Sequence, residues 1–186
     1  MGKFNICCCV SALTLAALSP VLTASADTPW GIKLSGRLLY DYTRADADTA
    51  DFEIDDTELR SARLALSGKT DVMAFKVELE TDEGGEIIAT DAYTDFSPKG
   101  TSWKIRIGQF KTPNSLEEQT SGRFTTFAER AEFTDAFEFD RRVGIATHTK
   151  GKDWTFMAGA FGGDLNDTPS EEGLALAARG TYTPVH

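Results

Sequence analysis

Charged side chains recur at every second position in several segments of this sequence, with apolar residues between them. Residues i, i+2 and i+4 of a β-strand share one face, so these charges gather on one face of any sheet that the segments form. The bases on that face are Lys33, Arg37, Arg63, Lys76, Lys104, Arg106, Arg142 and Arg179. The acids on it are Asp41, Glu78, Glu80, Asp91 and Asp95. A pore wall with an excess of Lys and Arg attracts anions, and Arg can bind phosphate through two parallel hydrogen bonds.

The same bases have a second interpretation. They can pair with acids on neighbouring strands and hold the wall of the sheet together, because opposite charges directly across a sheet attract. The two roles are compatible, since one set of bases can do both.

Residues with catalytic or metal-binding spacing are missing from the sequence. It has no phosphate-cradling glycine loop, no GxSxG and no HExxH motif, and its two histidines are His148 and His186. Asp91 and Asp95 would lie roughly 13 Å apart along an extended strand, too far for a glycosidase carboxylate pair. The acidic segment 45–58 departs from the EF-hand pattern and indicates a solvated loop, with a weak divalent-ion site as the alternative. We therefore predict no enzyme, no metal centre and no cofactor.

The elements that must position the charges read as β-strands, because the apolar and polar residues alternate at period two. In the third of these segments, for example, the apolar positions are Met73, Phe75, Val77 and Leu79, and the polar ones are Lys76, Glu78 and Glu80. The pattern predicts eight strands, at 31–44, 59–68, 72–81, 87–97, 102–109, 141–150, 153–162 and 173–183. The connections at 69–71, 98–101 and 151–152 are short, whereas those at 45–58, 82–86, 110–140 and 163–172 are generally longer. Short turns at one rim and longer loops at the other are typical of outer-membrane barrels.

The composition limits the class of protein. The chain has 186 residues, 19 basic and 29 acidic, with a net charge of −10. Residues 1–26 read as a signal peptide, with Lys3 before an apolar stretch and a small-residue cleavage site at Ala24-Ser25-Ala26. Removing them takes away one base and all three cysteines, at 7–9, so residues 27–186 carry a net charge of −11 and no thiol. This acidic balance argues against a nucleic-acid partner.

We predict an all-β fold in which residues 27–186 belong to a transmembrane antiparallel β-barrel. A soluble β-sandwich also shows alternation. The barrel is favoured because aromatic residues lie near strand ends on the apolar face, where barrels carry interfacial girdles. These aromatics are Tyr40, Tyr42, Phe96, Trp103, Trp154 and Tyr182.

Several short motifs, in order, resemble the phosphate-selective porin O/P family. The main one is Gly108-Gln109-Phe110-Lys111-Thr112-Pro113, followed by Ser115-Leu116-Glu117. Further matches are Arg60-Ser61-Ala62-Arg63-Leu64, Asp91-Ala92-Tyr93, Thr126-Phe127-Ala128-Glu129-Arg130 and Arg141-Arg142-Val143-Gly144. Together they span roughly residues 31–165.

The resemblance implies a 16-stranded homotrimeric porin in the outer membrane of a Gram-negative cell, in contact with outer-membrane lipid. It implies passive diffusion of small anions such as phosphate. Its third outer loop would fold into the lumen, and residues 110–140 stand in that place, with Lys111, Arg123 and Arg130 as constriction candidates. Eight strands make about half of such a barrel, so we expect the chain to be part of a longer protein. The alternative is a closed eight-stranded outer-membrane barrel with a structural or binding role.

Overall fold

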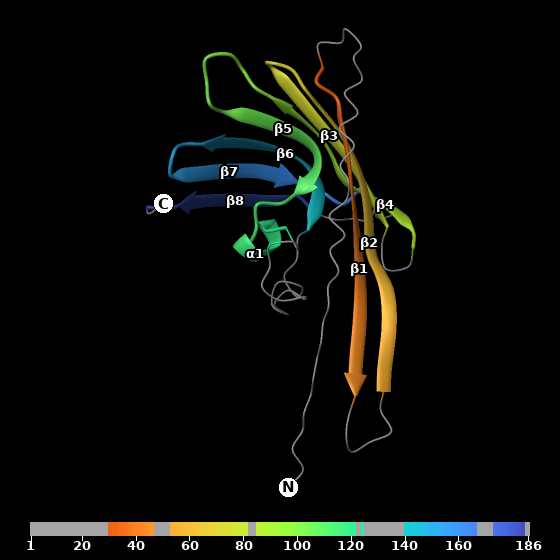
Figure 1. Ribbon diagram of the computed structural model, residues 1–186. Coiled ribbons are helices and arrows are strands. Elements are labelled where there is room, and N and C mark those ends of the chain that lie inside the picture. Colours follow the sequence, from red (N-terminus) through yellow and green to blue (C-terminus); the bar gives the residue numbers. More distant parts are fainter. Residues whose placement is uncertain are drawn as a thin grey trace.

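The computed structural model describes residues 30–46, 53–81, 85–121, 124, 140–166 and 173–184, and in them eight strands form one sheet (Figure 1). The strands are β1 (Lys33–Asp46), β2 (Glu53–Lys69), β3 (Met73–Thr81), β4 (Ile87–Phe96), β5 (Lys104–Lys111), β6 (Arg141–Lys150), β7 (Trp154–Phe161) and β8 (Ala175–Tyr182). Each predicted strand is confirmed, within a few residues at most ends. The exception is the hairpin of β1 and β2.

Every strand pairs antiparallel with its neighbours in the sequence, in the order β1 to β8. The sheet is strongly curved, since β1 and β2 run across the direction of β7 and β8 (Figure 1). It is open, with β1 and β8 as its two edges. The antiparallel all-β prediction is therefore confirmed, whereas the closed barrel is not seen in these eight strands.

The hairpin of β1 and β2 is longer than the sequence predicted. The prediction of a loop over 45–58 was wrong in its extent. Strand β1 continues to Asp46, and β2 begins at Glu53, which pairs with Asp46. The hairpin projects well past the ends of the other strands (Figure 1). A two-stranded ribbon with no sheet neighbour has no apolar face to bury, so acids are tolerated on it and the period-two signal is lost. Residues 47–52, with Asp48 and Asp51, lie outside the described part.

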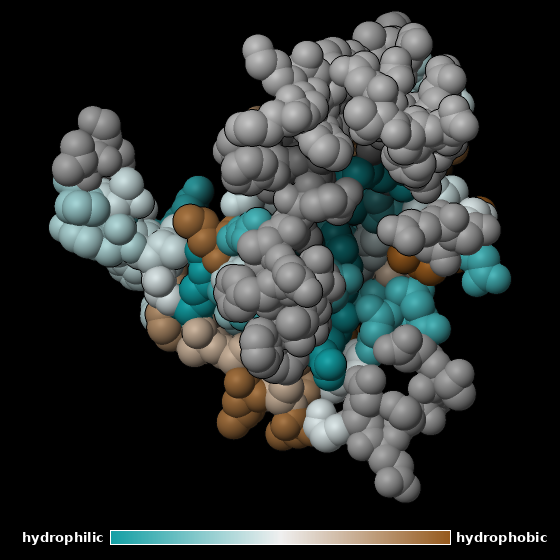
Figure 2. Space-filling view, turned by 90° about the horizontal axis from the view of Figure 1, so that it is seen from below, coloured by the Kyte–Doolittle hydropathy of each residue, from teal (hydrophilic) through white to brown (hydrophobic). Residues whose placement is uncertain are grey.

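Residues directly opposite each other on paired strands share a face, so the register fixes the two surfaces of the sheet. One surface is apolar and exposed: Leu64, Ile145 and Leu176 expose 55%, 52% and 79% of their area. In Figure 2, hydrophobic residues gather along an outer border of the molecule and hydrophilic ones lie toward its middle. The only strongly packed cluster, in the part of the chain described, is on the other surface, where Phe110, Ala146 and Phe161 are buried.

One short helix was not predicted from the sequence. It is α1 (Leu116–Gln119), within the connection after β5, and the Ser115 hydroxyl caps it by accepting a bond from the Glu118 N–H. Four residues are too few for a helical period to show. Within the described residues, no helix has the length and apolar character needed to cross a membrane.

Strand β5 bends at Gly108, which has a φ of 126°, a conformation that L side chains rarely adopt. A Cβ at this position would also collide with the Ala92 carbonyl oxygen and lie 2.7 Å from the Tyr93 Cα on β4. The pairing of β4 with β5 runs only from Phe96 to Ala92. Beyond the bend, Phe110 packs edge-on against the rings of Tyr93 and Phe161. The glycine of the main motif therefore allows the strand to bend over the polar face.

We expect Gly108→Ala to lower the free energy of unfolding by about 1–3 kcal/mol, since it adds a side chain to a strained backbone position. The measurement is the unfolding midpoint followed by β-sheet circular dichroism. Gly173→Ala is the matched control, because a Cβ at Gly173 would meet nothing within 4 Å and its φ is ordinary. Equal midpoints for the two variants would contradict the bend.

Candidate functional site

The register places all eight predicted wall bases on one face of the sheet. Arg37 lies opposite Arg63, and Arg63 lies opposite Glu80. Farther along the sheet, a single row of opposed residues runs from Lys104 through His148 and Met157 to Arg179. The remaining bases, Lys33, Lys76, Arg106 and Arg142, fall on the same face by the same alternation. Four of the five predicted acids share it, because Glu78, Glu80, Asp91 and Asp95 occupy positions of the same parity, whereas the side chain of Asp41 lies outside the described part of the chain.

A chain of ion pairs crosses this face from β2 to β6. The Arg63 guanidinium is 2.6 Å from the Glu80 carboxylate and 3.5 Å from that of Glu78. The Lys76 ammonium continues the chain, 2.9 Å from Glu78 and 2.6 Å from Asp91. These side chains are largely shielded from solvent, which strengthens the pairs relative to exposed ones. The wall-holding role proposed for Arg63 and Lys76 is therefore what their contacts show.

Arg106 forms a second cluster on β4, β5 and β6. Its Nε and Nη2 donate to the two oxygens of Asp95 at 2.7 and 2.8 Å, the bidentate arrangement that suits a guanidinium. Its Cζ lies 3.8 Å from the centre of the Tyr93 ring, a cation–π contact. The His148 Nε2 is 3.4 Å from the same Asp95 carboxylate. The contacts of Arg106 therefore also show a role in holding neighbouring strands of the wall together.

Three of the predicted bases keep their charge uncompensated. Lys33, Lys104 and Arg179 form no ion pair within the residues that the structure describes. All three lie toward the ends of strands that meet the short turns. Arg142 donates from Nη1 to the Gly162 carbonyl oxygen at 3.1 Å. The ion-pair chain of Arg63 and Lys76 therefore extends toward the long connections, whereas Arg106 pairs with Asp95 beside the short turn after β4.

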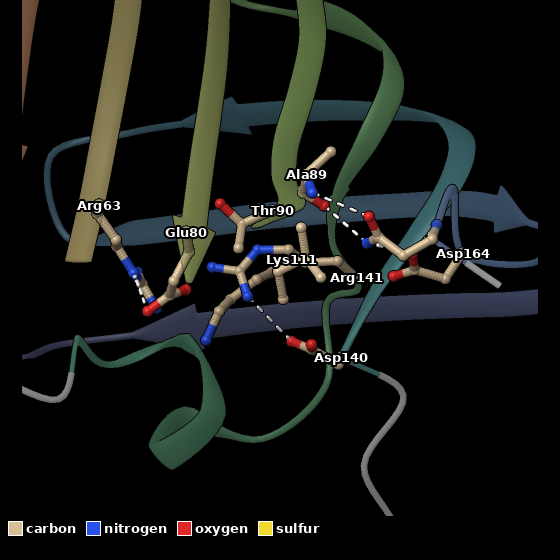
Figure 3. Close-up of a pocket in the computed structure, with 10 residues that line it drawn as sticks. Arg63, Glu80, Ala89, Thr90, Lys111, Asp140, Arg141 and Asp164 are labelled. Atoms are coloured by element: carbon tan, nitrogen blue, oxygen red, sulfur yellow. Dashed lines mark hydrogen bonds and ion pairs between the residues drawn. The ribbon is translucent and has the colours of Figure 1, made fainter. Parts of the chain in front are cut away.

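A cavity of about 270 Å³ opens at the rim of the long connections (Figure 3). Figure 3 shows the side chains of Arg63, Lys111 and Arg141 approaching it together with acidic residues. Its lining comprises Arg63, Glu80, Ile88, Ala89, Thr90, Lys111, Asp140, Arg141, Asp164 and Asn166. Of the constriction candidates, Lys111 lines this cavity, whereas Arg123 and Arg130 lie outside the described residues. Arg63 and Glu80, which the alternation placed on the polar face, line the cavity as well.

The base of the long connection is tied to the wall by hydrogen bonds. The Lys111 Nζ donates to the Glu118 carbonyl oxygen at 2.6 Å, and the Asn114 amide donates to the buried Glu118 carboxylate at 2.8 Å. The Thr112 N–H donates to the Asp140 carbonyl oxygen at 2.9 Å, which joins the two ends of the connection. The position of Lys111 is therefore fixed from both sides.

Arg141 is a site residue that the sequence reasoning missed. Alternation assigned only Arg142 to the polar face, yet the Arg141 Nε lies 3.1 Å from the Asp91 carboxylate and its Nη1 lies 3.3 Å from that of Asp140. Asp140, the residue before β6, has a φ of 29°, which is not a strand conformation. The side chain of Arg141, the first residue of β6, therefore need not follow the alternation of the rest of the strand. The signal available in the sequence was the paired Arg141-Arg142 at a strand start.

Gln109 is the second missed residue. It stands on the apolar side of the alternation, after Ile105 and Ile107, but its side chain is fully buried. Its amide nitrogen donates to the Ala89 carbonyl oxygen at 2.7 Å, and its amide oxygen accepts from the Leu165 N–H at 2.6 Å. The Asn166 side chain bonds both the N–H and the carbonyl of Ala89, at 2.9 Å each. The side-chain amides of Gln109 and Asn166 thus satisfy backbone groups of β4 that have no partner on β5 beyond the bend.

No group of three His, Cys, Asp or Glu side chains comes together to hold a metal ion in the described part of the chain. The site is accordingly a charged, partly neutralised wall with a polar cavity at one rim. It can attract, orient and release ions, because Lys and Arg side chains replace part of the hydration of an anion.

Comparison with known proteins agrees with this geometry. The profile of a family described as phosphate-selective porin O and P matches residues 32–186. A curated protein of Caulobacter vibrioides, named only as an uncharacterized protein, is 29% identical over 135 residues. That match covers 66% of this chain and 27% of the relative, so the chain spans about a quarter of the relative's length.

The central position of Asp91 in the ion-pair chain gives a stability prediction. Asp91→Asn leaves the Lys76 and Arg141 charges facing each other with one carboxylate fewer, and we expect it to lower the free energy of unfolding by about 1–3 kcal/mol. Lys104→Gln is the control, since no ion pair is lost, and should stay within about 0.5 kcal/mol of the parent. Chemical unfolding midpoints compare the three proteins. An Asp91→Asn midpoint equal to that of the control would show that the ion-pair chain adds no stability.

Proposed function

The chain belongs to the phosphate-selective porin O and P family, and on that premise we propose that it forms part of the wall of an outer-membrane channel for passive diffusion of small anions. The observation that carries the proposal is the opposite character of the two sheet faces. One face exposes large apolar side chains, as a lipid-facing wall does, and the other bears full charges in mid-strand. Passage through such a channel makes and breaks no bond.

Anion preference follows from which charges remain uncompensated. The acids Glu78, Glu80, Asp91 and Asp95 are all engaged by neighbouring bases, whereas Lys33, Lys104 and Arg179 have no carboxylate partner in the described residues. An ion in the lumen therefore meets a wall whose free charge is positive, although the whole chain is acidic. Lys111 at the rim cavity, with Arg123 and Arg130 in the long connection, would narrow and charge the passage. Phosphate is a suitable solute, because Arg binds its oxygens in pairs.

Closure of the channel requires further strands. Each unpaired backbone group in lipid costs several kcal/mol, and β1 and β8 each present such an edge. A closed eight-stranded barrel would need β1 to pair with β8, and it would leave room only for side chains. We propose that the longer protein, of which the relative's length is an example, completes a barrel of 16 strands and assembles as a homotrimer. A leader at residues 1–26 would direct its export to the Gram-negative outer membrane.

The orientation of the two faces can be tested by cysteine labelling. The three native cysteines lie at 7–9, so a single cysteine placed after the leader is reported without background. A cysteine at Lys104 should react with a small aqueous thiol reagent from the lumen, whereas one at Ile105 or Ile107 should face lipid and stay unlabelled. A one-residue change of register exchanges all three outcomes, so labelling at Ile105 and Ile107 alone would refute the assignment of faces.

Selectivity can be tested by reversal potentials in planar bilayers, using the longest reading frame that contains this chain. The parent channel should prefer anions over cations. Replacing Lys33, Lys104 and Arg179 together by Gln, or Lys111, Arg123 and Arg130 together by Glu, should weaken or invert that preference.

The control is neutralisation of Asp46, Asp48 and Asp51, in the acidic segment for which the sequence predicts a solvated loop. These charges should have little effect, since the charges of a solvated loop are screened within about 8–10 Å at physiological salt. A parent channel that prefers cations, or a reversal potential unmoved by both sets of base replacements, would refute the anion channel and leave only the β-sheet wall.

A further inference from the structure

His148 lies on the charged face of β6, in the same row as two bases that form no ion pair within the described residues. It is directly opposite Lys104 on β5, and on its other side Met157 of β7 stands between it and Arg179 of β8. Neighbouring strands are about 4.8 Å apart, so the backbone of His148 lies within roughly 10 Å of both bases, about one screening length at physiological salt. The side chain exposes 24% of its area. The imidazole therefore reaches water on the charged side of the sheet, between two positive charges.

Asp95 is the carboxylate that faces His148, and its charge is already balanced. The Nε2 of His148 lies 3.4 Å from the Asp95 Oδ1. The two oxygens of Asp95 also accept bonds from Arg106, at 2.7 and 2.8 Å, so one guanidinium already opposes the single negative charge. No second carboxylate forms an ion pair with His148 in the part of the chain described. A proton taken up by His148 therefore adds a positive charge that the wall does not cancel.

The other charged groups around His148 come from three neighbouring strands and from β6 itself, and all but one are bases. They are Asp95 on β4, Lys104 and Arg106 on β5, Lys150 two residues along β6, and Arg179 on β8. Strand β7 contributes the uncharged Met157 to the row. The phenol of Tyr93, whose ring contacts Arg106, is neutral at physiological pH. This set of charges has a net value of +3 with a neutral imidazole and +4 with a protonated one.

Histidine is the side chain whose charge ordinarily changes between pH 5 and 8. Over that range lysine and arginine keep their protons, and most carboxylates stay ionised. Within the row of Lys104, His148 and Arg179, His148 is therefore the one member that gains charge as the solution becomes more acidic.

We propose that His148 is a selectivity residue of the channel wall, which binds a proton below neutral pH and thereby increases the preference for anions over cations. The proposal rests on the proposed function, because it makes the charge of that channel's wall depend on pH. The only chemical step is reversible transfer of a proton between water and an imidazole nitrogen. A unit charge about 8 Å from an ion in water changes the local concentration of that ion about twofold. Anions are attracted and cations repelled, so the permeability ratio should rise by roughly twofold to fivefold between pH 8 and pH 5.

Reversal potentials in planar bilayers under a gradient of potassium chloride test the proposal, with the longest reading frame that contains this chain. The potential is measured at pH 8, 7, 6 and 5. Chloride is the chosen anion because it does not titrate, whereas a phosphate group changes its charge at about pH 6. The ratio of chloride to potassium permeability should rise in the parent as the pH falls.

Three variants assign the effect to one residue. His148→Gln should give a ratio that stays at the parent's pH 8 value at every pH, because the amide cannot be charged. His148→Arg should give a ratio that stays near the parent's pH 5 value, because its charge is permanent. His186→Gln is the matched control, since it removes the other histidine of this chain and should retain the full pH dependence.

The outcomes distinguish this proposal from the channel proposal. A parent ratio that does not change with pH, or a pH dependence that is equal in the parent and in His148→Gln, overturns the role of His148 even where the channel prefers anions. A parent that prefers cations at every pH refutes the anion channel, yet a shift toward anions that requires His148 still supports this role. Where His148→Gln gives no channel, His148→Arg decides, because it keeps a cation beside Asp95 and a pH-dependent ratio in that variant overturns the proposal.

Discussion

Hydrogen bonds between neighbouring backbones place every side chain of this sheet, because directly opposed residues share a face. One antiparallel register, repeated through seven strand pairs, brings Arg63, Lys76, Asp91 and Arg106 onto one surface and Leu64, Ile105 and Ile145 onto the other. A shift by one residue in any pair would exchange the two surfaces from that strand onward. The exposed apolar surface and the ion-pair chain are both consequences of this single constraint, although they lie on opposite faces.

The charged face serves two needs that compete for the same residues. A stable wall requires that each base has a neighbouring carboxylate, whereas attraction of an anion requires bases that have none. The sheet divides these two needs between different residues: the carboxylates of Glu78, Glu80, Asp91 and Asp95 are paired with bases, and Lys33, Lys104 and Arg179 form no ion pair within the described residues. Counting bases and acids along the sequence predicts the excess of positive charge, but it does not predict where that excess lies, because pairing depends on distances across strands.

The sequence was sufficient for the eight strands, their antiparallel order and the polar face, since period-two alternation is a local property that each strand shows by itself. It was insufficient where the backbone departs from that period. Gln109 follows two isoleucines of the apolar face, yet after the bend at Gly108 it is buried and forms hydrogen bonds with Ala89 and Leu165. Arg141 begins its strand from a turn and so escapes the alternation. The ribbon of β1 and β2 was underestimated because strands with no buried face carry no amphipathic signal.

The backbone hydrogen bond between Thr112 and Asp140 joins the two ends of the long connection at its base. With Lys111 held against α1 on one side and Arg141 held by Asp91 on the other, both ends of the connection have fixed contacts. All of these contacts are made by residues at its two ends, so a substitution between residues 125 and 139 removes none of their atoms. A loop anchored in this way can vary in sequence between its anchors, as the hypervariable loops of antibody domains do.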